Sequence, residues 1–180
     1  MGKDWYIVCL MHNFILRLDG FPFSVGREPP EGGHRLAIDE PFISRLQFVL
    51  ERREDGRLWY VNRSRTNPAL IDGKPLLELQ LTSRDVHLVT IGDLVVGFGT
   101  DAPAVFQAVA DASPDLYGVS YRGREFGPLL FEHLVEACTK RVFDETATTW
   151  LLRDPDQVYN LFELAKRTKP ASAAQWLSAV

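Results

Sequence analysis

The chain has 180 residues, of which 46% are hydrophobic and 24% are charged. This composition is typical of a folded globular protein and excludes a disordered chain. The formal net charge of -4 excludes a general affinity for nucleic acid or for an anionic membrane surface, so any anion site must be a local cluster. The length suits one domain of about 100 residues with a smaller attachment.

The first apolar run, residues 5–11, is typical of a strand. Asp4 precedes it, His12 and Asn13 interrupt it, and no small-residue cleavage site follows, so it does not resemble a signal peptide. No apolar run approaches the roughly 20 residues of a membrane-spanning helix. We therefore expect a cytoplasmic protein that does not enter a membrane.

Short runs of apolar, β-branched and aromatic residues continue to residue 98, with turn residues between them. The runs are residues 5–11, 14–18, 21–25, 34–38, 46–52, 58–62, 69–71, 86–91 and 94–98. Many short strands with turns roughly every 8 to 12 residues predict an antiparallel β-sandwich, here assigned to residues 1–100. His87 alternates with apolar neighbours, which places it on the solvated face of its strand.

The pattern changes after Gly99, and residues 101–180 are predicted to form an α-helical extension of unknown role. Residues 102–111 have helical spacing. Gly127-Pro128 is expected to open a helix with apolar positions from Leu130 to Val142. A second helix is expected to start at Asp154-Pro155-Asp156-Gln157, which resembles a capping box. A last short helix is expected over residues 172–179.

Cys9 and Cys138 are the two cysteines, and each lies in an apolar pattern, so we expect reduced, buried thiols in preference to a disulfide. The four histidines are scattered, and no nucleophile elbow, zinc motif or phosphate-binding Walker loop is present. The sequence therefore predicts a non-enzyme with no catalytic residue, no metal and no cofactor. An enzyme with its chemistry in the helical half is an alternative.

Three polar runs, the last of which leads to a turn at Asp72-Gly73, separate the strands between residues 25 and 73. They are Gly26-Arg27-Glu28, Ser44-Arg45-Leu46-Gln47 and Ser64-Arg65-Thr66-Asn67-Pro68. Loops at one end of a sandwich can converge, and these would bring together arginine, hydroxyl and amide donors. Charge-assisted donors of this kind suit a phosphate group.

The order of these runs, followed by Gly92-Asp93 and an apolar strand, resembles the forkhead-associated (FHA) domain over residues 4–100. The resemblance implies a β-sandwich that binds phosphothreonine peptides through its apical loops. It implies that Arg27 and Ser44 contact the phosphate, with Thr66 beside them, and that Asn67 holds the peptide backbone. From its charge alone, Arg45 either adds a further cation to the site or lies along the surface. Two residues depart from the family pattern: Gln47 replaces a bracing histidine, and Pro68 replaces a glycine.

The prediction is thus a mainly β protein, an FHA-like sandwich with a helical extension, that acts as a phosphothreonine-binding adaptor in signalling. Its partner would be a phosphorylated protein such as a kinase or a kinase substrate. Three alternatives remain at this stage. Arg27 could pair with Glu28 or Glu31, Ser44 could be a turn residue, and the domain could be a degenerate scaffold that binds a partner without phosphate. The sequence does not indicate an oligomeric state.

Overall fold

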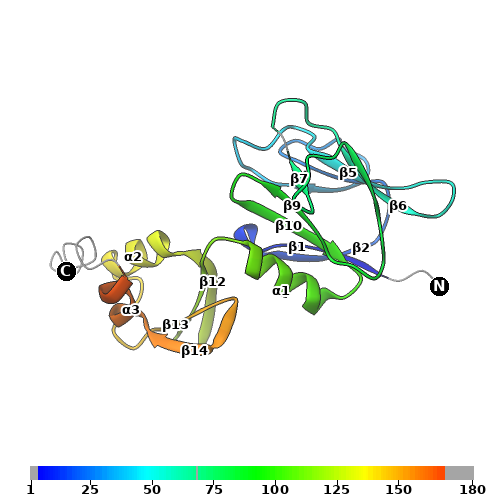
Figure 1. The fold of residues 1–180 in the computed structure, drawn as a ribbon. Helices are drawn as coiled ribbons and strands as arrows, with labels where there is room; N and C mark the ends of the chain where they lie inside the picture. The colour runs from blue at the N-terminus through cyan, green and yellow to red at the C-terminus, as the bar shows by residue number, and fades with distance from the viewer. Residues whose placement is uncertain (1–3, 68, 169–180) are drawn as a thin grey trace. The chain divides into compact units, whose positions relative to one another are not determined.

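The computed structural model describes residues 4–67 and 69–168. The chain divides into two compact units, residues 1–113 and residues 114–180, which are drawn in Figure 1 and are described separately below. The sequence predicted a change from strands to helices after Gly99.

The first unit contains two five-stranded sheets. One sheet has the spatial order β2 (Phe14–Leu18), β1 (Trp5–Cys9), β10 (Leu94–Gly99), β9 (His87–Ile91) and β7 (Leu70–Ile71). The other has the order β4 (His34–Ala37), β3 (Phe23–Gly26), β5 (Phe48–Arg52), β6 (Leu58–Asn62) and β8 (Glu78–Leu81). Neighbouring strands are antiparallel, except that β3 and β4 run parallel. A 3-10 turn, η1 (Leu10–His12), joins β1 to β2.

The core of this unit lies between the two sheets, where Phe48 of β5 joins them. Its ring centroid lies 5.3 Å from that of Tyr60 on β6 and 5.9 Å from that of Phe98 on β10 in the opposite sheet. All three rings are fully buried. Burial of a large apolar side chain contributes about 1.5–3 kcal/mol. The predicted mainly β class and the sandwich are confirmed.

Helix α1 (Ala102–Ala112) covers the outer face of the first sheet, along β1 and β10 (Figure 1). The Asp101 side chain caps it by accepting a hydrogen bond of 3.2 Å from the Ala104 N–H. Val105 and Val109 approach β10 at Gly97, where a Cβ would overlap Val109. The helix predicted at residues 102–111 is confirmed, and it packs within the first unit.

In its described residues, 114–168, the second unit is a four-stranded antiparallel sheet with two helices. The spatial order is β12 (Arg124–Leu130), β11 (Leu116–Tyr121), β13 (Thr148–Leu151) and β14 (Asp154–Asn160). α2 (Phe131–Thr139) follows β12 directly and α3 (Leu161–Thr168) follows β14 directly, so the unit consists of two successive hairpin–helix segments. Both helices contribute to one core, with Leu134 and Leu161 packed against Val119 of β11.

Helices are present in the C-terminal part, as predicted, but two expected helix starts were wrong. Gly127-Pro128 lies in β12, and Asp154-Pro155 lies in β14. Both are edge strands of their sheet, where a proline can face away from the ladder without losing a needed N–H bond. The helices begin later, at Phe131 and Leu161. The short helix expected at residues 172–179 lies outside the described residues.

His87 was expected on a solvated face, and this was wrong, because its side chain is buried. Its Nε2 accepts the Thr82 N–H at 3.1 Å, so Nδ1 carries the proton and donates to Asp72 Oδ2 at 2.8 Å. Asp72 Oδ1 in turn accepts the Leu88 N–H at 2.8 Å. His87 therefore ties the turn after β7 to the end of β8.

Both cysteines are free and buried, as predicted. Burial raises the pKa of the Cys9 thiol, and likewise that of Cys138, to about 11. Neither thiol is ionised near neutral pH, so neither has the character of a reactive nucleophile.

Candidate functional site

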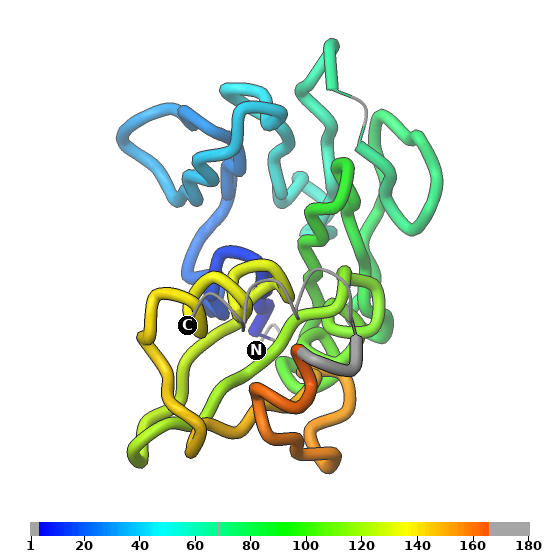
Figure 2. The backbone as a smooth tube through the Cα atoms, turned by 90° about the vertical axis from the view of Figure 1, so that its left-hand side faces the viewer, coloured from blue at the N-terminus to red at the C-terminus, as the bar shows by residue number. Residues whose placement is uncertain are grey.

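Three loops of the first unit meet at one end of the sandwich. They follow β3, precede β5 and follow β6, and Figure 2 shows them in blue to teal at the same end of this unit. The first two are joined by main-chain hydrogen bonds: the Arg27 N–H donates to the Ser44 carbonyl at 2.9 Å, and the Glu28 N–H donates to the Arg45 carbonyl at 3.0 Å. The two loops therefore continue the pairing of β3 with β5.

Gly26, the last residue of β3, makes this pairing possible. A Cβ at this position would overlap the carbonyl oxygen of Arg45, so only glycine allows the two backbones to approach so closely. The Gly26 carbonyl also accepts the Ile38 N–H at 2.9 Å. The glycine thus sets Arg27 directly beside Ser44.

Gln47 joins the second loop to the third. Its side chain is fully buried; Oε1 accepts the Ser44 N–H at 3.0 Å, and Nε2 donates to the Asn67 carbonyl at 3.1 Å. Its own carbonyl accepts the N–H groups of Arg63 and Ser64, at 2.9 Å and 3.1 Å. A glutamine therefore braces these loops from inside, at the position where a histidine was expected from the resemblance.

Two serine hydroxyls lie together above this brace. Ser44 Oγ is 2.7 Å from Ser64 Oγ, and Ser64 Oγ accepts the Asn67 N–H at 3.0 Å. Ser64 was not among the site residues predicted from the sequence. The signal was present, because Ser64 opens the third polar run, but the spacing alone does not distinguish it from Thr66 as the hydroxyl that turns inward.

The other predicted site residues lie around this pair. Asn67 donates its side-chain N–H to the Phe42 carbonyl, which holds the second loop against the third. Thr66 is exposed on the third loop, and no described residue bonds to its hydroxyl. The structure thus brings Arg27, Ser44 and Asn67 into one network and leaves Thr66 at its rim.

The two arginines flank a single carboxylate. Arg27 Nε lies 3.7 Å from Glu28 Oε1, and Arg45 Nε lies 3.8 Å from Glu28 Oε2. The pairing of Arg27 with Glu28, an alternative left open by the sequence, is therefore present. Exposed pairs of this kind are worth about 0–1 kcal/mol and do not hold an arginine against a stronger anion. Arg27 Nε is buried and has no hydrogen-bond partner among the described residues.

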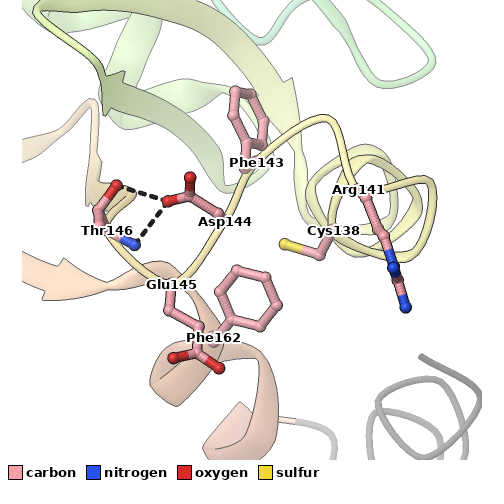
Figure 3. Close-up of a pocket in the computed structure, with 7 residues that line it drawn as sticks. All are labelled: Cys138, Arg141, Phe143, Asp144, Glu145, Thr146 and Phe162. Carbon is pink, nitrogen blue, oxygen red and sulfur yellow. Dashed lines mark hydrogen bonds between the residues drawn. The ribbon is translucent and has the colours of Figure 1, made fainter.

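The second unit has a separate cavity of about 470 Å³. It is lined by Cys138, Arg141, Phe143, Asp144, Glu145, Thr146 and Phe162. Figure 3 shows the Phe162 ring and the Cys138 sulfur facing the same space, while the Arg141 guanidinium points away from it. Hydrogen bonds from the Thr146 hydroxyl and N–H, and then from the Tyr121 hydroxyl, hold the pKa of Asp144 well below its usual range. A buried thiol with a raised pKa and a carboxylate that is already ionised at neutral pH do not form a nucleophile and its base.

No cluster of three potential metal ligands occurs within residues 4–67 and 69–168. Across the same residues, no helix is both long and apolar enough to cross a membrane.

Comparison with known proteins identifies the loop-bearing unit. Residues 23–92 match the family model of the FHA domain. The chain therefore carries an FHA domain, as its loop motifs predicted. FHA domains are binding modules and not enzymes. A search of curated proteins finds no match to the chain.

Solved FHA structures are similar to the same part of the chain. The FHA domain of the CT664 protein from Chlamydia trachomatis is 17% identical, with a TM-score of 0.46, over 56% of this chain and 100% of that one. FHA-1 of Mycobacterium tuberculosis Rv1747 is 17% identical, with a TM-score of 0.43, over 55% and 97%. The N-terminal FHA domain of S. cerevisiae Rad53p, solved with a phosphothreonine peptide, is 18% identical, with a TM-score of 0.44, over 56% and 96%.

Proposed function

We propose that this chain is a non-enzymatic adaptor whose FHA domain binds phosphothreonine peptides through the three loops. The observation that carries the proposal is the network in which Gln47 fixes Ser44 and Asn67 beside Arg27. A phosphorylated residue brings close to two negative charges and three strong acceptor oxygens. Donors held in place before binding lose little entropy when that group arrives.

Each site residue has a distinct role in this proposal. Arg27 donates to the phosphate with its guanidinium, whose Nε–H makes no hydrogen bond to a described residue and lies 3.7 Å from Glu28 Oε1. The Ser44 hydroxyl donates once it turns from Ser64 toward the phosphate. Arg45 adds positive charge from the rim, and Thr66 lies beside the phosphate. Asn67 keeps its N–H on the Phe42 carbonyl and offers Oδ1 as an acceptor to a backbone N–H of the peptide.

The partner in this proposal is a phosphorylated cytoplasmic protein, such as a kinase or a kinase substrate. No described feature of the domain selects a peptide sequence, so an oriented phosphothreonine library is the means to find one. The selected peptide is then compared with its unphosphorylated and phosphoserine forms by calorimetry, with wild type and with Arg27→Ala.

We expect binding that requires the phosphate and is lost in Arg27→Ala. A Ser44→Ala variant should bind less tightly by roughly ten- to 150-fold, since a hydrogen bond to a charged group is worth about 1.5–3 kcal/mol. Equal affinity for phosphorylated and plain peptides would instead indicate a scaffold that recognises its partner without phosphate.

A further inference from the structure

Glu28 occupies a fixed place between the two cations of the proposed site. Its N–H bonds to the Arg45 carbonyl at 3.0 Å, so the backbone pairing sets the two side chains side by side. One carboxylate oxygen faces Arg27 Nε at 3.7 Å and the other faces Arg45 Nε at 3.8 Å. All three side chains are partly exposed, with 63% exposure for Glu28. The carboxylate therefore competes with an oxyanion ligand for the same two arginines.

We propose that Glu28 is an internal counter-ion that weakens the site for its phosphate ligand and that the ligand must displace. The proposal rests on the function proposed above, and it assigns a role to a residue next to the site. These two arginines and one glutamate have a combined charge of +1, whereas the two arginines without the carboxylate have a charge of +2. Removal of Glu28 should therefore strengthen attraction for every anion, and for a dianion more than for a monoanion, because the Coulomb energy scales with the product of the charges.

Two other acidic residues of these loops, Glu40 and Glu31, do not pair with Arg27 or Arg45. Glu40 lies 3.2 Å from His12 Nε2, away from both arginines. Glu31 is exposed in the loop after β3, and within the described residues it has no ion pair with Arg27 or Arg45. Glu31 is therefore a matched control, since Glu31→Gln removes the same charge from the same loop.

The test compares wild type, Glu28→Gln and Glu31→Gln in the full chain. Each is titrated with the selected phosphothreonine peptide and with the same peptide carrying glutamate in place of phosphothreonine. We expect Glu28→Gln to bind the phosphopeptide about three- to tenfold more tightly at low ionic strength, given two exposed pairs of about 0–1 kcal/mol each. The gain should be smaller for the glutamate peptide, and should shrink at high salt as screening increases.

A double-mutant cycle links the effect to the arginine. The gain from Glu28→Gln should be smaller in an Arg45→Met background, because one of the two cations that the carboxylate neutralises is absent. Thermal unfolding of each variant checks that the fold is intact.

The outcomes separate the two proposals. If wild type binds the phosphopeptide and Glu28→Gln changes its affinity no more than Glu31→Gln does, the role of Glu28 is overturned and the proposed function stands. Binding by Glu28→Gln where wild type binds weakly supports it strongly. Absence of phosphate-dependent binding in both folded proteins overturns the proposed function, and the role of Glu28 with it.

Discussion

The side chain of Gln47 spans two loops: it accepts a hydrogen bond from the Ser44 N–H and donates one to the Asn67 carbonyl. The buried side-chain amide of Gln47 thus fixes the distance between the Ser44 hydroxyl and the Asn67 side-chain amide of the candidate site. An amide has a donor and an acceptor at its two ends, as a neutral histidine has, so it can brace both loops at once.

Replacement of Gln47 by alanine should therefore weaken the domain and the site together. It leaves the Ser44 N–H and the Asn67 carbonyl without their partner, and an unsatisfied buried polar group costs about 1–3 kcal/mol. Urea unfolding should show a loss of this size, and phosphopeptide affinity should fall. Gln107→Ala, on the exposed face of α1, is the control. Equal stability of the two variants would contradict the bracing role.

Gly26→Ala should destabilise the domain by about 1–3 kcal/mol, which is the usual cost of forcing extra atoms into a packed site. The reason is the overlap of the new Cβ with the Arg45 carbonyl oxygen. Gly33→Ala is the matched control, because a Cβ there meets no atom within 4 Å. Differential scanning calorimetry should show a lower Tm for the first variant only. A normal Tm for Gly26→Ala would mean that the loops separate easily.

Loss of the His87 imidazole should loosen the side of the sandwich that carries β7, β8 and β9. His87→Ala removes the bonds to Thr82 and Asp72 and leaves a cavity, for which we expect a loss of about 2–4 kcal/mol. Hydrogen exchange should increase first in the amides of β9. His133→Ala, at an exposed position of α2 in the other unit, should leave those amides unchanged. Unaltered exchange in His87→Ala would show that the hydrogen bonds of His87 to Thr82 and Asp72 do not stabilise β9.

Asp144 should make the second unit sensitive to acid. Its folded-state pKa is lowered by the hydrogen bonds from Thr146, Tyr121 and Arg122, so its stabilising contribution is complete above the ordinary aspartate pKa near 4. That contribution is lost as pH falls further, toward the folded-state pKa. Asp144→Asn should therefore expose the amides of β11 and β13 to faster exchange at pH 7, with a difference from wild type that narrows below about pH 4. A difference that widens on acidification would refute this assignment.

The first unit could be predicted well because its strands follow simple patterns. Phe48, Val49 and Leu50 form a buried apolar run that ends at the more exposed Glu51 and Arg52, and turn residues separate such runs. The position of Gln47 in the loop order pointed to a bracing residue, but its two bonds depend on the packing of separate loops. Ser64 and His87 were missed for the same reason: which of several polar residues turns inward is decided by tertiary contacts.

The second unit was harder because its local signals favour the wrong element. Gly127-Pro128 and Asp154-Pro155 are good helix starts by local chemistry, yet both lie in edge strands. The hairpin turn at Arg122-Gly123, where both residues have positive φ, is a better guide. Pairing of β11 with β12 and β13 outweighs the capping preference, since tertiary packing overrides local propensity.

The most direct test of the central claim is a titration of the ¹⁵N-labelled chain with a phosphothreonine peptide, followed by NMR. The account predicts shifts concentrated at Gly26 to Glu28, Ser44 to Leu46 and Ser64 to Asn67, together with a large shift of the Arg27 Nε–H signal. The unphosphorylated peptide should leave these signals in place. Shifts confined to residues 114–168, or equal shifts with both peptides, would contradict phosphate recognition by these loops.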